Sequence, residues 1–154
     1  MSLRWKAGFL LVGAMLFGAA PVMAAPDVVG SWKVSFFAEP NHSGGSTHCM
    51  TFKKTGGILG EPNSGTWQAV TSPGWKGEWI QEGDYVRWYG IQASGISSHA
   101  HSGLLVSSTI MTGEFDTFTS AAKTSNSGTW SATKVNQCTS SSSANAATGS
   151  DVTR

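Results

Sequence analysis

Two histidines separated by one residue are the side chains in this sequence best suited to do chemistry. His99 and His101 lie in the segment SSHAHSG, where an extended strand would direct both imidazoles to the same face. Imidazoles at that spacing can chelate zinc, copper or nickel. No carboxylate follows them closely, and the other histidines, His42 and His48, lie in no metal-binding pattern. We favour the simpler interpretation, a serine-rich hairpin with two exposed histidines. We therefore expect no cofactor and no metal, and keep the pair as the secondary candidate for a metal site.

Five carboxylates are the remaining candidates for acid–base chemistry. Nothing in the sequence indicates that they are buried, and burial is a main cause of a shifted carboxyl pKa. The chain also lacks the Gly-x-Ser-x-Gly segment of a nucleophilic serine and a glycine-rich phosphate loop. We therefore predict a protein that binds rather than an enzyme. The carboxylates are Glu78, Glu82, Asp84, Glu114 and Asp116.

Tryptophan is more informative, because the 154 residues include 7 of them. Rings that line the inside of a barrel could bind an apolar or planar ligand, together with a few polar groups that orient it. The alternative is that a small barrel simply fills its interior with these rings. The candidate ligand-binding residues are Trp32, Trp67, Trp79, Trp88 and Trp130, with Arg87 and Gln81 as the polar groups.

Alternation in YVRWYG also places aromatic rings on the opposite face. If Val86 and Trp88 face the interior, then Tyr85, Arg87 and Tyr89 face outward. Tyrosine and arginine are favoured anchors in protein interfaces. A protein-facing patch is therefore a second interpretation of this segment.

A glycine stands two residues before a tryptophan at four places, in the segments GSW, GTW, GEW and GTW that begin at residues 30, 65, 77 and 128. In a strand both residues face the same side. The glycine lets the strand bend or admits a neighbouring ring, and the tryptophan fills the space. The motif predicts barrel corners and their filling.

Short alternating segments separated by Gly, Pro, Asn and Ser clusters predict an all-β chain. Closure into an eight-stranded antiparallel up-and-down barrel would remove the exposed edges of an open sheet. The expected strands span residues 29–37, 47–54, 65–70, 75–81, 85–92, 98–106, 109–115 and 128–135.

The two ends of the chain differ from this pattern. Residues 1–25 combine a basic start, a short apolar run and small residues at a cleavage site, which is typical of a signal peptide. The barrel domain is expected over 26–138. Residues 139–154 are Ser, Ala, Thr and Gly with almost no apolar content, so we expect a disordered tail.

Charge and cysteine content limit the compartment and the partners. Removing Arg4 and Lys6 from the 10 basic residues leaves 8 against 9 acidic ones, a net charge near −1. A nearly neutral chain has no electrostatic reason to bind nucleic acid or an anionic membrane. Cys49 and Cys138 are the only cysteines, and an exported chain most simply pairs them, two free thiols being the alternative.

The first Gly-x-Trp segment, residues 30–32, begins the first expected strand, and residues 128–130 begin the last. With cysteines in an early strand and at the C-terminal end, this arrangement resembles the calycin superfamily, which includes lipocalins and avidins. The helix that usually follows a lipocalin barrel is missing, and biotin-binding residues cannot be matched one by one. The resemblance implies a small barrel with a small-molecule cavity.

We thus expect an exported small-molecule-binding barrel, a carrier or scavenger of a small apolar or planar ligand in the bacterial periplasm or outside the cell. The alternative is an extracytoplasmic protein-interaction module such as a protease inhibitor. Its inhibitory element would be residues 25–27 or the loop 40–47. A small barrel enzyme is the third interpretation. A carrier requires a hollow barrel, and an inhibitor an exposed loop or arm.

Overall fold

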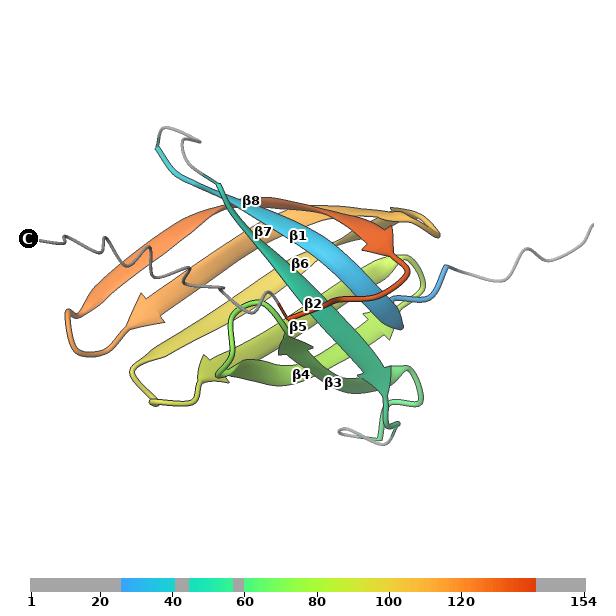
Figure 1. The fold of residues 1–154 in the computed structure, drawn as a ribbon, viewed down its shortest axis with the longest axis horizontal. Helices are drawn as coiled ribbons and strands as arrows, with labels where there is room; N and C mark the ends of the chain where they lie inside the picture. Colours follow the sequence, from blue (N-terminus) through green and yellow to red (C-terminus); the bar gives the residue numbers. More distant parts are fainter. Residues whose placement is uncertain (1–25, 41–44, 57–59, 141–154) are drawn as a thin grey trace, which may run out of the picture.

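The computed structural model describes residues 26–40, 45–56 and 60–140, so the expected signal peptide, His42 and most of the expected tail lie outside the described residues. Eight antiparallel strands follow one another in chain order around a closed barrel, and β1 also pairs with β8 (Figure 1). The strands are β1 (Gly30–Ala38), β2 (Ser46–Lys54), β3 (Ser64–Ala69), β4 (Trp75–Glu82), β5 (Tyr85–Gln92), β6 (Ser97–Ser107), β7 (Ile110–Thr119) and β8 (Thr124–Val135).

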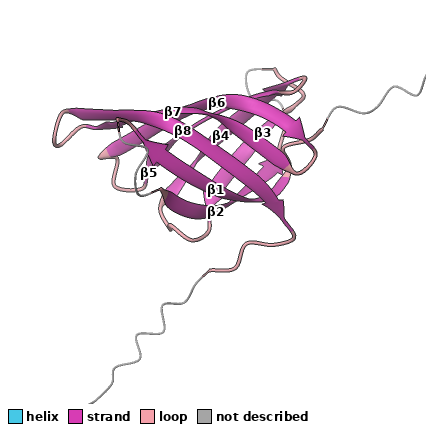
Figure 2. Ribbon diagram, turned by 90° about the horizontal axis from the view of Figure 1, so that it is seen from above, coloured by secondary structure: helices cyan, strands magenta, loops and turns pink. Residues whose placement is uncertain are grey.

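The predicted all-β, eight-stranded antiparallel up-and-down barrel is confirmed. The described part of the chain consists of strands and loops (Figure 2), and it offers no long apolar helix of the kind that crosses a membrane. Most strands match the predicted ranges within a residue. The exceptions are β7 and β8, which form a longer hairpin than expected because its outer part is rich in Ser and Thr and carries little apolar alternation.

Reciprocal pairing of glycine and tryptophan explains the repeated motif. Across the β3–β4 ladder, Gly65 is the partner of Trp79 and Trp67 is the partner of Gly77. A Cβ atom added to Gly65 would lie 2.8 Å from Trp79 Nε1, and one added to Gly90 would lie 2.4 Å from the Trp67 ring. Each ring therefore covers backbone that only glycine can leave bare. The prediction that the glycine admits a neighbouring ring is confirmed, because the ring lies over the glycine of a neighbouring strand.

Trp130 repeats this arrangement on the other side of the barrel. Its ring lies over Gly103 and Gly113, where an added Cβ would approach it to 2.5 and 2.6 Å. The indole Nε1 donates a hydrogen bond of 2.9 Å to the Glu114 carbonyl oxygen. Only 1% of Trp130 is exposed, so the side chain combines apolar burial with a satisfied polar atom.

The N-terminal segment closes one end of the barrel. Val28 is fully buried, its N–H donates to Gln81 Oε1 at 3.0 Å, and its carbonyl accepts a hydrogen bond of 2.7 Å from Trp32 Nε1. Gln81 Nε2 donates to the carbonyl oxygens of Pro26 and Gly83 at 2.6 and 2.7 Å. This end is therefore filled by the chain itself.

A disulfide joins β2 to the segment that follows β8. Cys49 and Cys138 are bonded, with Cα atoms 5.5 Å apart and a sequence separation of 89 residues. Since Met50 and its alternate neighbours face the interior, Cys49 lies on the outer side of β2. The predicted pairing is confirmed, and it fixes the C-terminal end of the domain against the barrel wall.

Candidate functional site

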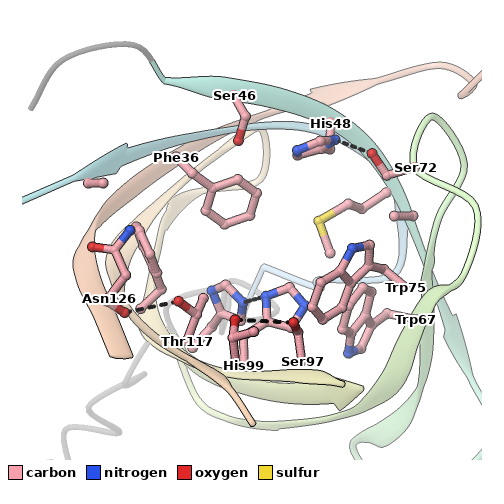
Figure 3. Close-up of a pocket in the computed structure, with 16 residues that line it drawn as sticks. Phe36, Ser46, His48, Trp67, Ser72, Trp75, Ser97, His99, Thr117 and Asn126 are labelled. Carbon is pink, nitrogen blue, oxygen red and sulfur yellow. Dashed lines mark hydrogen bonds between the residues drawn. The ribbon is translucent and has the colours of Figure 1, made fainter. Parts of the chain in front are cut away.

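The end of the barrel opposite the N-terminal segment holds a cavity of about 310 Å³ (Figure 3). Inward-facing side chains of seven strands, all except β5, and one loop residue form its wall. Aromatic rings and a methionine make up the deep part, while serine, threonine and asparagine side chains stand toward the rim. The main lining residues are Phe36, Met50, Trp67, Trp75 and Phe115, three histidines (His48, His99 and His101), and the polar residues Ser46, Ser72, Ser97, Thr117, Thr119 and Asn126.

Stacked rings separate this cavity from the filled half of the barrel. His101 lies parallel to Trp88, with ring centroids 4.7 Å apart and an interplanar angle of 12°. Trp88 in turn contacts Trp130 at a centroid distance of 4.4 Å. All three side chains are at least 96% buried, because their exposed fractions are 4% or less. The two expectations of a filled barrel and a hollow one therefore each hold for one half of the interior.

His99 and His101 are hydrogen-bonded to each other. Their Nδ1 and Nε2 atoms, respectively, are 3.0 Å apart, and alternation along β6 directs both rings inward. The remaining ring nitrogens, His99 Nε2 and His101 Nδ1, are buried and have no hydrogen-bond partner. The interpretation of these residues as an exposed pair on a hairpin is wrong, because the register of β6 turns them into the barrel.

His48 reaches the cavity from the opposite wall. Its Nδ1 is 2.5 Å from Ser72 Oγ, and its ring centroid is 5.9 Å from that of Phe36. Figure 3 shows the ring at the edge of the cavity, with its hydrogen-bonded edge toward Ser72. The Ser72 hydroxyl can donate or accept, so this contact is compatible with either neutral tautomer of His48.

All three histidines of the cavity are held in the neutral form. Burial lowers the pKa of His48 from 6.5. Burial, together with repulsion from His48, lowers the pKa of His99 to about 4. Burial and the neighbouring His99 hold the pKa of His101 well below 6.5. Since the lining residues that the structure describes include no Asp, Glu, Lys or Arg, this part of the cavity wall is uncharged at neutral pH.

Two hydrogen bonds connect polar residues of the rim. Ser97 Oγ and Thr119 Oγ1 are 3.2 Å apart, and Thr117 Oγ1 donates to the carbonyl oxygen of Asn126 at 3.2 Å. These contacts join β6, β7 and β8 at the cavity mouth. The rim is therefore wettable, whereas the deeper wall is apolar.

Only one of the five candidate tryptophans lines the cavity. Trp67, from β3, forms part of the wall, and its Nε1 donates to the Tyr89 carbonyl oxygen at 2.9 Å. Trp88 and Trp130 lie behind His101. Trp32 and Trp79 do not line the cavity and belong to the buried core of the barrel.

The two candidate polar groups lie elsewhere. Arg87 is on the outer surface, with its side chain 55% exposed, and it pairs with Glu82 at 3.3 Å. Gln81 faces inward but at the closed end, where it binds the N-terminal segment. The prediction that they orient a ligand in this cavity is wrong. Arg87 faces outward by alternation along β5, and Gln81 lies at the closed end of β4.

Comparison with known proteins gives information on the fold. No protein-family model and no curated protein matches the sequence. A solved structure of a redesigned β-barrel, b11L5F_LGL, is similar, with a TM-score of 0.51, 22% identity, and coverage of 70% of this chain and 90% of that chain. The likeness is one of barrel architecture. At this identity the redesigned barrel supports the fold and carries no information on a ligand.

Nothing in the described residues points to catalysis. No group of three or more His, Cys, Asp or Glu side chains in the described ranges is arranged to hold a metal ion. The candidate carboxylates Glu82, Asp84, Glu114 and Asp116 are exposed, and Glu78 accepts a hydrogen bond from the Tyr89 hydroxyl on the outer face. These carboxylates are therefore not gathered into one cleft, and the ionisable side chains that do converge are the three histidines of the cavity.

Protonation of the histidines should make stability depend on pH. The pKa of histidine in the unfolded chain is near 6.5. In the folded protein the pKa of His99 is lowered to about 4, and the pKa of His101 is also well below 6.5. Between these values the unfolded chain binds more protons, so the histidine contribution is complete above pH 6.5 and is lost as the pH falls toward 4. Each proton is worth at most about 1.4 kcal/mol per pH unit. Urea unfolding between roughly pH 7.5 and 4.5 measures this slope.

The matched control for this prediction replaces both His99 and His101 with leucine. The double variant keeps every carboxylate, so the difference between its slope and that of the natural chain isolates the two histidines. We expect a shallower slope below pH 6.5 for the variant. Equal slopes would contradict the burial of neutral imidazoles in the folded protein.

Proposed function

We propose that this chain is an exported barrel of calycin type that carries or sequesters a small apolar or planar molecule. The observation that supports this most is the cavity of about 310 Å³ at one end of a barrel whose other half is filled. Small-molecule sites are concave, largely apolar and furnished with a few polar groups, and volumes start near 300 Å³. The aromatic wall and the histidines fit that description.

The energetics of the wall favour a ligand. Apolar surface in contact with water costs about 25 cal/mol per Å². Phe36, Trp67, Trp75 and Phe115 present aromatic rings to the cavity, and a planar molecule seated there would remove part of that surface from water. Affinity would therefore come from apolar burial and orientation from the polar groups.

Export is the part of the proposal that depends on the N-terminus and on the cysteines. The Cys49–Cys138 disulfide is typical of oxidising compartments such as the periplasm or the cell exterior. Residues 1–25 have the composition of a signal peptide. The start of the first strand at Gly30 with Trp32 beneath it supports calycin type.

An interaction module remains the second candidate because of the outer surface of β5 and β6. Tyr89, Ile91, Leu104 and Val106 are between 51% and 63% exposed. Apolar and aromatic side chains of this kind are found in protein interfaces. The N-terminal arm supports this candidate less, because Pro26 and Val28 are bonded to Gln81 instead of projecting freely.

Native mass spectrometry of the protein purified from the organism that makes it tests the proposal. We expect a discrete non-covalent adduct that fits the cavity and is lost on denaturation. The denatured chain should weigh two hydrogens less than its reduced form because of the disulfide. An adduct-free mass, under conditions that preserve another known non-covalent complex, would contradict a resident ligand.

A further inference from the structure

His48 is the polar side chain best placed to contact a molecule inside the cavity. It comes from β2, whose alternation turns His48, Met50 and Phe52 inward. Figure 3 shows it across the cavity from His99, between Phe36 on one side and Trp75 on the other. Ser72 Oγ is hydrogen-bonded to His48 Nδ1 at 2.5 Å, so Nε2 is the ring nitrogen that is left to bind a ligand. In contrast, the unpaired nitrogens of His99 and His101 are enclosed by protein and belong to the wall.

The contact with Ser72 lets His48 match either kind of hydrogen-bonding group. If the Ser72 hydroxyl donates to Nδ1, then Nε2 of neutral His48 carries the proton and is a donor. If Nδ1–H donates to Ser72 Oγ instead, Nε2 is an acceptor. A ligand with one hydroxyl, carbonyl or ring nitrogen can thus be bound without placing a charge in the cavity.

The uncharged wall selects against ions. Removing a charged group from water without a compensating partner is very costly. Among the residues that the structure describes, no Lys or Arg lines the cavity to pair with an anion, and no Asp or Glu lines it to pair with a cation. The titratable groups in the described part of the wall are the three histidines, which come from β2 and β6.

Size and shape narrow the class further. At the packing density of protein interiors, about 310 Å³ holds roughly a dozen non-hydrogen atoms. The ring centroids of Phe36 and Phe115 are 5.6 Å apart in an edge-to-face arrangement, and those of Trp75 and His99 are 3.9 Å apart. Aromatic rings therefore line the cavity on two sides. A flat ring system gains from such surroundings through offset or edge contacts.

Resting on the proposed function, we propose that the ligand is an uncharged, flat ring compound the size of a bicyclic aromatic, with one polar group hydrogen-bonded to His48 Nε2. Its ring lies against the aromatic wall, and its polar group lies at the cavity mouth. His48 is then the residue that distinguishes the ligand from an equally apolar molecule without that group.

Equilibrium dialysis at neutral pH with three probes that share the naphthalene ring system tests this ligand class. The probes are 2-naphthol, which has one hydroxyl, naphthalene, which has no polar group, and 2-naphthoate, which is an anion. We expect 2-naphthol to bind about tenfold more tightly than naphthalene. This factor corresponds to one hydrogen bond, which naphthalene cannot make to His48. We expect 2-naphthoate to bind more weakly than 2-naphthol, because its charge lacks a partner.

Two substitutions connect this preference to His48. His48→Leu removes both ring nitrogens at similar volume. It should reduce the affinity for 2-naphthol to that for naphthalene and leave the affinity for naphthalene unchanged. His48→Gln restores a group near Nε2 that can donate and accept, and it should recover part of the preference. Thr47→Leu, at the exposed neighbour on the outer face of β2, is the matched control and should change neither affinity.

The outcomes separate this inference from the proposed function. Equal binding of 2-naphthol and naphthalene by the natural chain, or an unchanged preference in a folded His48→Leu variant, would overturn the role of His48 and leave a binding cavity. Tighter binding of 2-naphthoate than of 2-naphthol would overturn the neutral ligand class. Saturable binding of none of the three probes would overturn both the inference and the cavity as a ligand site.

Discussion

Replacing both Cys49 and Cys138 with serine is expected to lower the free energy of unfolding by about 4 to 5 kcal/mol. The bond closes a loop whose ends are 89 residues apart in the sequence, so it restricts most of the domain in the unfolded state. It also anchors the segment after β8, where Cys138 is 9% exposed. Urea unfolding without reductant measures the difference between the variant and the natural chain.

A reductant is the internal control for this prediction. It should destabilise the natural chain toward the double-serine variant and leave the variant unchanged. Since small domains are stable by only about 5 to 15 kcal/mol, the loss would be a large fraction of the total. A double-serine variant with the midpoint of the natural chain would contradict the bridge as a main support of the barrel.

Trp130→Ala is expected to cost about 3 to 5 kcal/mol, the range for deleting a buried large aromatic side chain. Its ring covers the bare backbone of Gly103 and Gly113 and contacts Trp88, so its removal leaves a space between these groups. The Glu114 carbonyl oxygen would also lose a hydrogen bond from the indole. Thermal and urea unfolding measure the loss.

Phe118→Ala is the matched control on the neighbouring strand β7. Phe118 is 49% exposed and faces outward, so its removal should change stability by no more than about 0.5 kcal/mol. Comparable losses for the two variants would show that Trp130 does not fill a barrel corner. A stable Trp130→Ala protein with an intact disulfide would do the same.

The barrel could be predicted because its signals are local. Alternation decides which side chains face inward, and Gly-Pro-Asn-Ser clusters mark the turns, so the strands and the inward tryptophans follow from neighbouring residues. The β7–β8 hairpin is longer than the sequence predicts, because residues 116–119 and 124–127 are mostly polar and lack regular apolar alternation. In this part of the hairpin the two strands are held together by their backbone hydrogen bonds, which leave no apolar pattern in the sequence of either strand.

The site was less predictable, since it depends on which end of the barrel each residue reaches. Trp75 and Gln81 lie on the same strand and both face inward, yet one stands at the cavity and the other at the closed end. Alternation in β2 was sufficient to turn His48 inward with Met50. Its partner Ser72 lies in a loop, and no spacing in the sequence connects the two residues.

The most direct test of the binding site is calorimetry with 2-naphthol on a pair of alanine-to-phenylalanine variants. Ala69 lies on the cavity wall and Ala100 on the outer face of β6, so Ala69→Phe fills the cavity and Ala100→Phe is its control. With circular dichroism confirming that both fold, we predict that Ala69→Phe weakens binding at least about tenfold, a loss of some 1.4 kcal/mol, while Ala100→Phe binds like the natural chain. Unchanged affinity in the Ala69→Phe variant would contradict the cavity as the binding site.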